Sequence, residues 1–212
     1  MGLSPLQLRV AQTFFALAES SGFTLGGGGA LIVQRLVERT TADLDLFSAE
    51  RAMVTVAADA LRGALVADGL ACHELRRHVG FVRVEVRDGD ERTEVDLALD
   101  PPWRDAVATE AGPARSSEEL AVDKLLALFG RAEARDFVDV FALAGRHGID
   151  RMLEWAPEKD AGFSPYRLAD ALGRMVQLDR GMFQVDDATY QAMIGFYADL
   201  RARLIARTVG GE

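Results

Sequence analysis

Two aspartates separated by one leucine have the spacing of a metal-binding pair. Asp43 and Asp45 lie in ADLDLF, residues 42–47, where apolar and polar residues alternate as in a half-buried strand. Alternate side chains of a strand share a face at a spacing of about 6.6 Å, so both carboxylates point the same way. Close carboxylates repel each other, and a Mg²⁺ ion between them relieves that repulsion while also binding substrate phosphates. An exposed sheet face is the commoner explanation of an isolated pair.

Four consecutive glycines, Gly26–Gly29, precede these aspartates and lead into an apolar run that predicts a short helix over residues 30–37. Glycines before a helix let the backbone approach a ligand and point its amides at an anion, although a tight turn explains glycines alone equally well. The spacing matches neither the P-loop nor the dinucleotide-binding pattern. Phosphate-binding amides and metal-binding carboxylates within twenty residues together indicate a nucleotide site.

This order of glycines, helix and Asp-x-Asp resembles the nucleotidyltransferase superfamily related to DNA polymerase β. It resembles more closely the AbiEii/AbiGii-type nucleotidyltransferases, toxins of type IV toxin–antitoxin pairs that include the MenT toxins. The residues that match this family are Gly27, Gly28, Ala30, Leu31, Arg39, Thr41, Asp43, Leu44, Asp45 and Phe47. Gly29 stands where the family usually has Thr or Ser, so we expect phosphate binding to depend more on backbone amides.

The resemblance continues in two later segments. Asp96, in EVDLALDPP, lies where the superfamily commonly has a third carboxylate. The stretch EELAVDKLLALFGRAEARDFVDVFAL is similar to a helical segment of the family, with matches at Glu119, Leu120, Lys124, Leu125, Ala127, Leu128, Arg131, Arg135, Asp136 and Asp139. The resemblance implies that Lys124 and one following aspartate belong to the active site, and it leaves Asp136 and Asp139 both open.

The same segment also allows a purely structural explanation. Lys124, one of only two lysines in the chain, shares a helical stripe with Leu128 and Arg131, and Arg135 with Asp139 has the spacing of an ordinary ion pair. We expect replacement of Lys124 to leave folding intact, because a surface ion pair contributes about 0–1 kcal/mol.

The resemblance implies a metal-dependent nucleotidyltransferase that moves a nucleoside monophosphate from a triphosphate, with CTP the first choice, to RNA such as the tRNA 3′ end, which blocks translation. Mg²⁺ or Mn²⁺ would be held by Asp43, Asp45 and Asp96. The implied nucleotide-binding residues are Gly27, Gly28, Gly29, Arg39, Thr41, Lys124, Arg131 and Arg135. An AbiEi-like antitoxin encoded nearby and a cytoplasmic location are further expectations. The alternatives are a small-molecule or protein nucleotidyltransferase, or a catalytically silent binding protein of the same fold.

The whole chain of 212 residues predicts an α+β fold: a mixed sheet flanked by helices over residues 1–110, and a helical portion over 111–212 that supplies Lys124 and Asp136 or Asp139. Strands are expected at 42–47 and within 70–100, with a hairpin turn at Asp88-Gly89. Helices are expected at 5–20, after an N-cap at Ser48, and at 117–130, 132–147, 149–155, 164–178 and 187–207. No apolar run approaches a membrane span.

An arginine cluster offers a place for RNA phosphates, although the formal net charge of −9 opposes general nucleic-acid binding. Its members are Arg76, Arg77, Arg83 and Arg87. A solvated sheet edge explains these arginines equally well.

Overall fold

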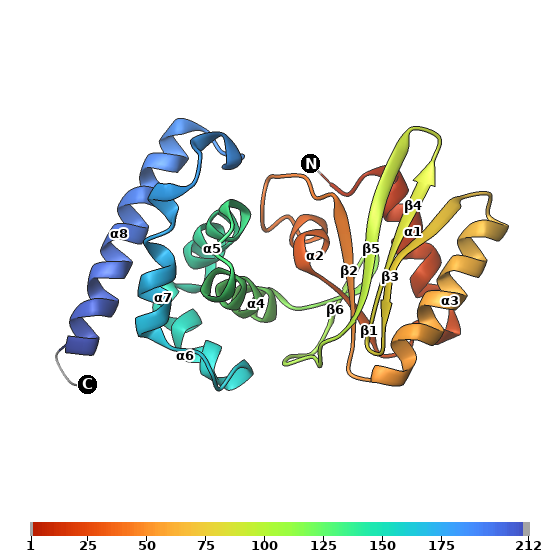
Figure 1. Cartoon of the computed structure of the whole chain (residues 1–212), viewed down its shortest axis with the longest axis horizontal. Helices are drawn as coiled ribbons and strands as arrows, with labels where there is room; N and C mark the ends of the chain where they lie inside the picture. The colour runs from red at the N-terminus through yellow and green to blue at the C-terminus, as the bar shows by residue number, and fades with distance from the viewer. Residues whose placement is uncertain (1, 210–212) are drawn as a thin grey trace. The chain divides into compact units, whose positions relative to one another are not determined.

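The computed structural model describes residues 2–209 and confirms the predicted α+β class, with a seven-stranded mixed sheet followed by a helical portion (Figure 1). The chain divides into two compact units after Leu120. The sheet unit extends past residue 110, where the sequence placed the division. The reason is a short strand, β7 (Gly112–Ala114), which pairs in parallel with β1 (Phe23–Gly26).

The strands of the sheet unit follow the order β3-β4-β5-β2-β1-β7-β6. The remaining bounds are β2 (Asp43–Ser48), β3 (Ala71–His78), β4 (Phe81–Asp88), β5 (Glu91–Leu99) and β6 (Val107–Thr109). β2 lies between β1, which is antiparallel to it, and β5, which is parallel to it. The predicted hairpin is present between β4 and β5, and Gly89 adopts the left-handed φ of +57° that this tight turn requires.

Two long helices, α1 (Pro5–Phe15) and α3 (Arg51–Ala67), lie on one side of this sheet (Figure 1). Ser4 and Gln7 form a capping box that starts α1. The prediction that Ser48 caps α3 is wrong: Ser48 ends β2, and its hydroxyl accepts a hydrogen bond from the backbone of the actual N-cap, Glu50. The fully buried side chains of this core include Val10, Phe14, Leu44, Leu46, Val54, Leu61, Val82, Val84, Val86, Val95 and Leu97.

A buried arginine organises the end of the sheet unit. The Arg115 side chain is 1% exposed, donates to the carboxylate and the carbonyl of Asp100, and lies 4.1 Å from the centre of the Phe47 ring. Its neighbour Glu119, at the start of α4 (Ser117–Gly130), accepts hydrogen bonds from the backbone amides of Trp103 and Arg104. Arg115 and Glu119 therefore hold the loop that follows β5.

The helical unit contains α5 (Ala134–His147), α6 (Ile149–Lys159), α7 (Pro165–Leu172) and α8 (Asp187–Val209). The helix predicted over 164–178 is shorter, because α7 ends at Leu172 and a short 3-10 helix follows at Met175–Gln177. Tyr197 of α8 donates a hydrogen bond of 2.5 Å to the Phe137 carbonyl in the core. Burial, helped by the charges of Asp139 and Asp136, raises the pKa of Tyr197 well above its usual value. Within residues 2–209, none of the helices has the length and apolar character of a membrane span.

Candidate active site

Four acidic residues gather on one face of the sheet, here called the carboxylate face: Asp43, Asp45, Glu94 and Asp96. The parallel pairing of β2 with β5 sets Asp43 opposite Glu94 and Asp45 opposite Asp96. Alternation along each strand sends the intervening apolar residues, such as Leu44 and Val95, into the core beneath. Asp96 is 8% exposed, whereas the other three are partly exposed. Two sequence-distant strands thus bring together the carboxylates predicted to bind metal.

The glycine run lies directly against these carboxylates. Gly27 has a left-handed φ of +54°, and a Cβ atom there would lie 1.7 Å from Oδ2 of Asp45. A Cβ on Gly28 would lie 2.7 Å from Oγ1 of Thr41 and 3.2 Å from Nη2 of Arg39. No other residue type fits the position of Gly27, since backbone strain and a collision with Asp45 both oppose a side chain.

The predicted loop of glycines is partly helical. Helix α2 (Gly27–Val33) begins inside the glycine run and ends before the predicted Val37. A Cβ on Gly29 would face the apolar side chains of Leu44 and Leu25, at 3.1 and 3.4 Å. Gly29 therefore points into the core, away from the set formed by Gly27, Gly28, Arg39 and Thr41.

Two polar side chains of the preceding loop complete this set. The Thr41 hydroxyl lies 2.7 Å from Oδ1 of Asp43, and Nη1 of the buried Arg39 donates to the Thr40 carbonyl at 2.8 Å. Thr41 therefore orients the Asp43 carboxylate, and the structure places the predicted residues Gly27, Gly28, Arg39 and Thr41 around the two aspartates.

Arg83 of β4 reaches the carboxylate face from the neighbouring strand. Its Nε and Nη2 each donate to one Asp96 oxygen at 2.6 Å, and its Nη1 lies 3.2 Å from Glu94. The hydrogen bonds to Asp96, followed by the charges of Asp96, Glu94 and Asp43, raise the pKa of Arg83 above its usual value. Arg83 thus remains charged and neutralises part of this acidic face.

The donor set of the carboxylate face suits a hard cation. Carboxylate oxygens are the ligands that Mg²⁺ prefers, and one or two of them suffice when substrate phosphates supply the rest. Asp43 and Asp45 meet this requirement on one strand. Among residues 2–206, no three His, Cys, Asp or Glu side chains are arranged as a metal centre, which agrees with the engagement of Asp96 by Arg83.

Lys124 and the two aspartates left open by the sequence take part in two ion pairs of the helical unit, of which the Lys124–Asp139 pair is buried on both sides. Nζ of Lys124 lies 2.9 Å from Oδ2 of Asp139, and the two side chains are 8% and 0% exposed. The Asp136 carboxylate is also fully buried and accepts hydrogen bonds from Nε and Nη2 of Arg131, each at 2.9 Å. It also closes the capping box that starts α5. Asp136 therefore has a structural role at a helix end, while Asp139 is the partner of Lys124.

The expectation that Lys124 forms a surface ion pair is wrong, because both members of the pair are buried. Nε of Arg135 lies 2.9 Å from Glu133 in an exposed pair, and the predicted pairing of Arg135 with Asp139 stays a prediction. The triphosphate contacts predicted for Lys124, Arg131 and Arg135 stay predictions.

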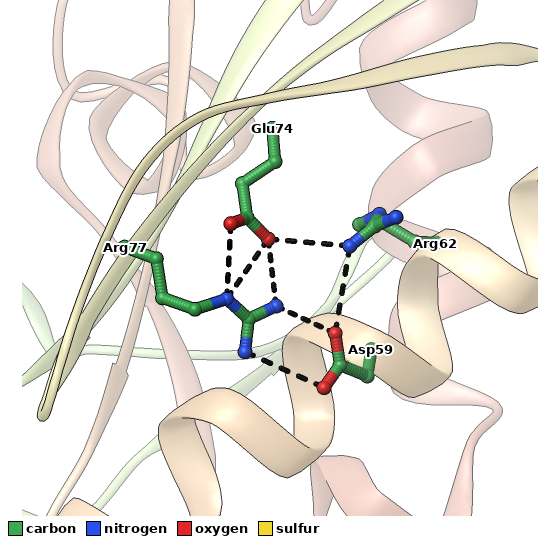
Figure 2. A network of polar contacts seen from close by, with 4 residues as sticks. All are labelled: Asp59, Arg62, Glu74 and Arg77. Atoms are coloured by element: carbon green, nitrogen blue, oxygen red, sulfur yellow. Dashed lines mark hydrogen bonds and ion pairs between the residues drawn. The ribbon is translucent and has the colours of Figure 1, made fainter.

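The four arginines predicted to bind RNA do not share one face. Arg77 is opposite Val82 and is held by Glu74 and Asp59, each at 2.6 Å, in a network with Arg62 on α3 (Figure 2). Arg76, in contrast, is opposite Arg83 on the side of the carboxylate face. Arg87 lies on that same face of β4 and binds Glu85. A register shift between Glu74 and Arg76 accompanies this arrangement of β3.

Sequence reasoning missed Glu94 as a member of the carboxylate face and Arg83 as its counter-ion. Glu94 and Asp96 have the same i, i+2 spacing as Asp43 and Asp45, so the signal for a second acidic pair was present in the sequence. The pairing of Arg83 with Asp96 had no local signal, because it depends on the register of β4 against β5.

Replacement of Gly27 by alanine should destabilise the sheet unit. The left-handed backbone alone costs about 1–2 kcal/mol for an L-residue, and the added Cβ must also displace Asp45. Urea unfolding measures the change. Gly63→Ala is the matched control, because Gly63 lies inside α3 with nothing near its Cβ position, and it should leave stability unchanged or raise it. Equal stability of both variants would contradict the geometry described for Gly27.

Replacement of Lys124 by methionine should lower the free energy of unfolding by about 3 kcal/mol or more, because Asp139 loses its ammonium partner while staying buried. The double variant Lys124→Met/Asp139→Leu should recover most of this loss. Chemical denaturation compares both with Arg135→Met, which breaks an exposed pair and should cost about 1 kcal/mol or less. A Lys124→Met protein as stable as the Arg135→Met protein would show that the buried pair contributes nothing.

Solved structures with the same fold come from bacterial and viral proteins. The crystal structure of JHP933 from Helicobacter pylori has a TM-score of 0.60 and 18% identity, over 99% of this chain and 97% of that one. A second H. pylori structure has the same score and identity over 95% and 94% of the two chains. The Megavirus polyadenylate synthase has a TM-score of 0.50 and 11% identity, over 68% of this chain and 31% of that protein. At these identities the likeness concerns the fold.

The sequence itself identifies the family. No curated protein sequence matches the chain. The family model described as "Nucleotidyl transferase AbiEii toxin, Type IV TA system" matches residues 11–195, which include the glycine run, the carboxylate face and both ion pairs of the helical unit. The chain therefore belongs to the AbiEii toxin family of type IV toxin–antitoxin systems and is a nucleotidyltransferase.

Proposed function

We propose that this protein transfers a nucleoside monophosphate from a nucleoside triphosphate to RNA, with Mg²⁺ or Mn²⁺ held at the carboxylate face. The observation that carries the proposal is the register that sets Asp45 opposite Asp96, with the Gly27 backbone against Asp45. Several carboxylates on one face supply the oxygen ligands that a phosphate-bound cation prefers.

Each group of the site then has a separate task. Asp43, oriented by Thr41, and Asp45 hold the cation, which neutralises charge on the phosphates when it is bound. The acceptor hydroxyl oxygen bonds to the α-phosphorus, the bond to the oxygen that bridges to the β-phosphate breaks, and pyrophosphate leaves. Asp96 is the third carboxylate available to the cation, and it also positions the acceptor hydroxyl and takes its proton.

The proposed acceptor is the 3′ end of tRNA, and CTP is the first nucleotide to test. Nucleotide addition there would prevent aminoacylation and so stop translation. The partner proposed for the toxin is an AbiEi-like antitoxin encoded nearby. A small-molecule acceptor is the second candidate, since the sheet unit, residues 1–120, contains 19 acidic and 12 basic residues and repels RNA at long range.

Triphosphate binding should depend on a divalent cation and on Asp43. Asp43→Asn removes a charged ligand with little change in shape, so it should abolish the metal-dependent part of nucleotide binding in calorimetric titrations with and without Mg²⁺. Asp90→Asn, in the exposed hairpin turn, removes the same charge away from the face and should behave as the wild type. Equal nucleotide affinity with and without metal would refute the role of the cation.

Transfer to RNA should depend on Arg76 and not on its neighbour Arg77. Arg76 lies on the side of the carboxylate face, whereas Arg77 is held by Asp59 and Glu74 on the other side of the sheet. The Arg76→Ala variant should therefore label tRNA less from a radiolabelled triphosphate. Its log–log salt dependence of RNA binding should be shallower by about 0.7 for each phosphate that Arg76 neutralises in the wild type.

Arg77→Ala is the matched control, because it removes the same charge one residue away. The assay offers the four triphosphates separately, together with total protein and small-molecule acceptors. Label on a small molecule or on protein, and never on RNA, would contradict the proposed acceptor while leaving the nucleotidyltransferase assignment intact.

A further inference from the structure

We infer that Arg83 is a built-in counter-ion that occupies Asp96 until a divalent cation displaces it, so that Arg83 sets the affinity of the site for the cation. This inference rests on the proposed function, since it concerns the third carboxylate of the same site. The family resemblance assigns Arg83 no role as a counter-ion of Asp96.

The contact between Arg83 and Asp96 engages both oxygens of the carboxylate that a cation would share. Both carboxylate oxygens accept a guanidinium nitrogen at 2.6 Å, in the parallel two-bond geometry that makes arginine–carboxylate pairs strong. A cation that approaches Asp96 meets the guanidinium charge at the same carboxylate, so Arg83 and the cation compete for it.

The two partners differ in their freedom to move. The Asp96 side chain is 11% exposed and the Arg83 side chain is 39% exposed. Asp96 is thus fixed within the sheet surface, while Arg83 can rotate toward solvent without disturbing the apolar core on the opposite side of β4. Displacement therefore moves the arginine and leaves the carboxylate in place for the incoming cation.

A second acid lowers the cost of this displacement. Nη1 of Arg83 already lies 3.2 Å from Oε2 of Glu94, two residues before Asp96 on β5. When Arg83 leaves Asp96, its charge remains next to Glu94 and is not stranded without a partner. Glu94 thus acts as the alternative partner that makes the exchange reversible.

Arg87 provides an internal comparison for this role. It lies on the same strand and the same face as Arg83, but its Nε binds Glu85 at 2.6 Å and it is opposite Arg92 rather than Asp96. Removal of either arginine changes the net charge equally, and only removal of Arg83 releases Asp96.

The test is a titration of the full chain with Mn²⁺ alone, with the free ion measured by electron paramagnetic resonance. Arg83→Gln should bind Mn²⁺ about fivefold more tightly than the wild type, the factor equivalent to the loss of a competing ion pair of about 1 kcal/mol. Arg87→Gln should remain near the wild-type affinity. Adding Asp96→Asn to Arg83→Gln should cancel the gain, because the released ligand is then removed.

Arg83→Lys guards against a folding defect in Arg83→Gln, because it keeps the charge but lacks the planar fork, and it should give a smaller gain. Equal Mn²⁺ affinity in Arg83→Gln and Arg87→Gln would overturn the inference, and so would weaker binding in Arg83→Gln. Those two results leave the proposed function standing. Absence of Mn²⁺ binding in every variant, with triphosphate present, would instead refute the metal-dependent function itself.

Discussion

Repulsion among the carboxylates of one sheet face is the constraint on which the site of this protein depends. Asp43, Asp45, Glu94 and Asp96 are brought together by the parallel pairing of β2 with β5. Like charges at such spacing oppose one another, and the protein meets this cost with a positive charge from the next strand, Arg83. The acidic face is consequently stable without a ligand and is still suited to a cation.

The apolar face of the same strands keeps the acids where they are. Leu44 and Leu46 alternate with the aspartates of β2 and are fully buried on the opposite face, and Val95 and Leu97 alternate with Glu94 and Asp96 on β5 in the same way. A slip of one residue in the β2–β5 register would turn the leucines to the solvent and the carboxylates into the core. The hydrophobic packing of α1 and α3 on the sheet therefore determines the geometry of the polar face.

The helical unit uses charge differently. Lys124 with Asp139 and Arg131 with Asp136 place fully buried carboxylates within reach of a cationic partner. Such pairs stabilise little compared with apolar packing, yet the loss of one partner is costly. Residues that match the family motif therefore also have structural roles. Asp136 closes the capping box that starts α5. In the sheet unit, Glu119 holds the loop after β5.

The sequence by itself determined the features that follow from local periodicity. Asp43 and Asp45 share a face because strand side chains alternate, and the hairpin at Gly89 and the helices of the second half follow from turn residues and helical spacing. Only the tertiary structure decided which strands are neighbours. Strand register set Asp96 opposite Asp45 and gave its oxygens to Arg83. Register arises from packing between residues far apart in the chain, and local periodicity carries no information about it.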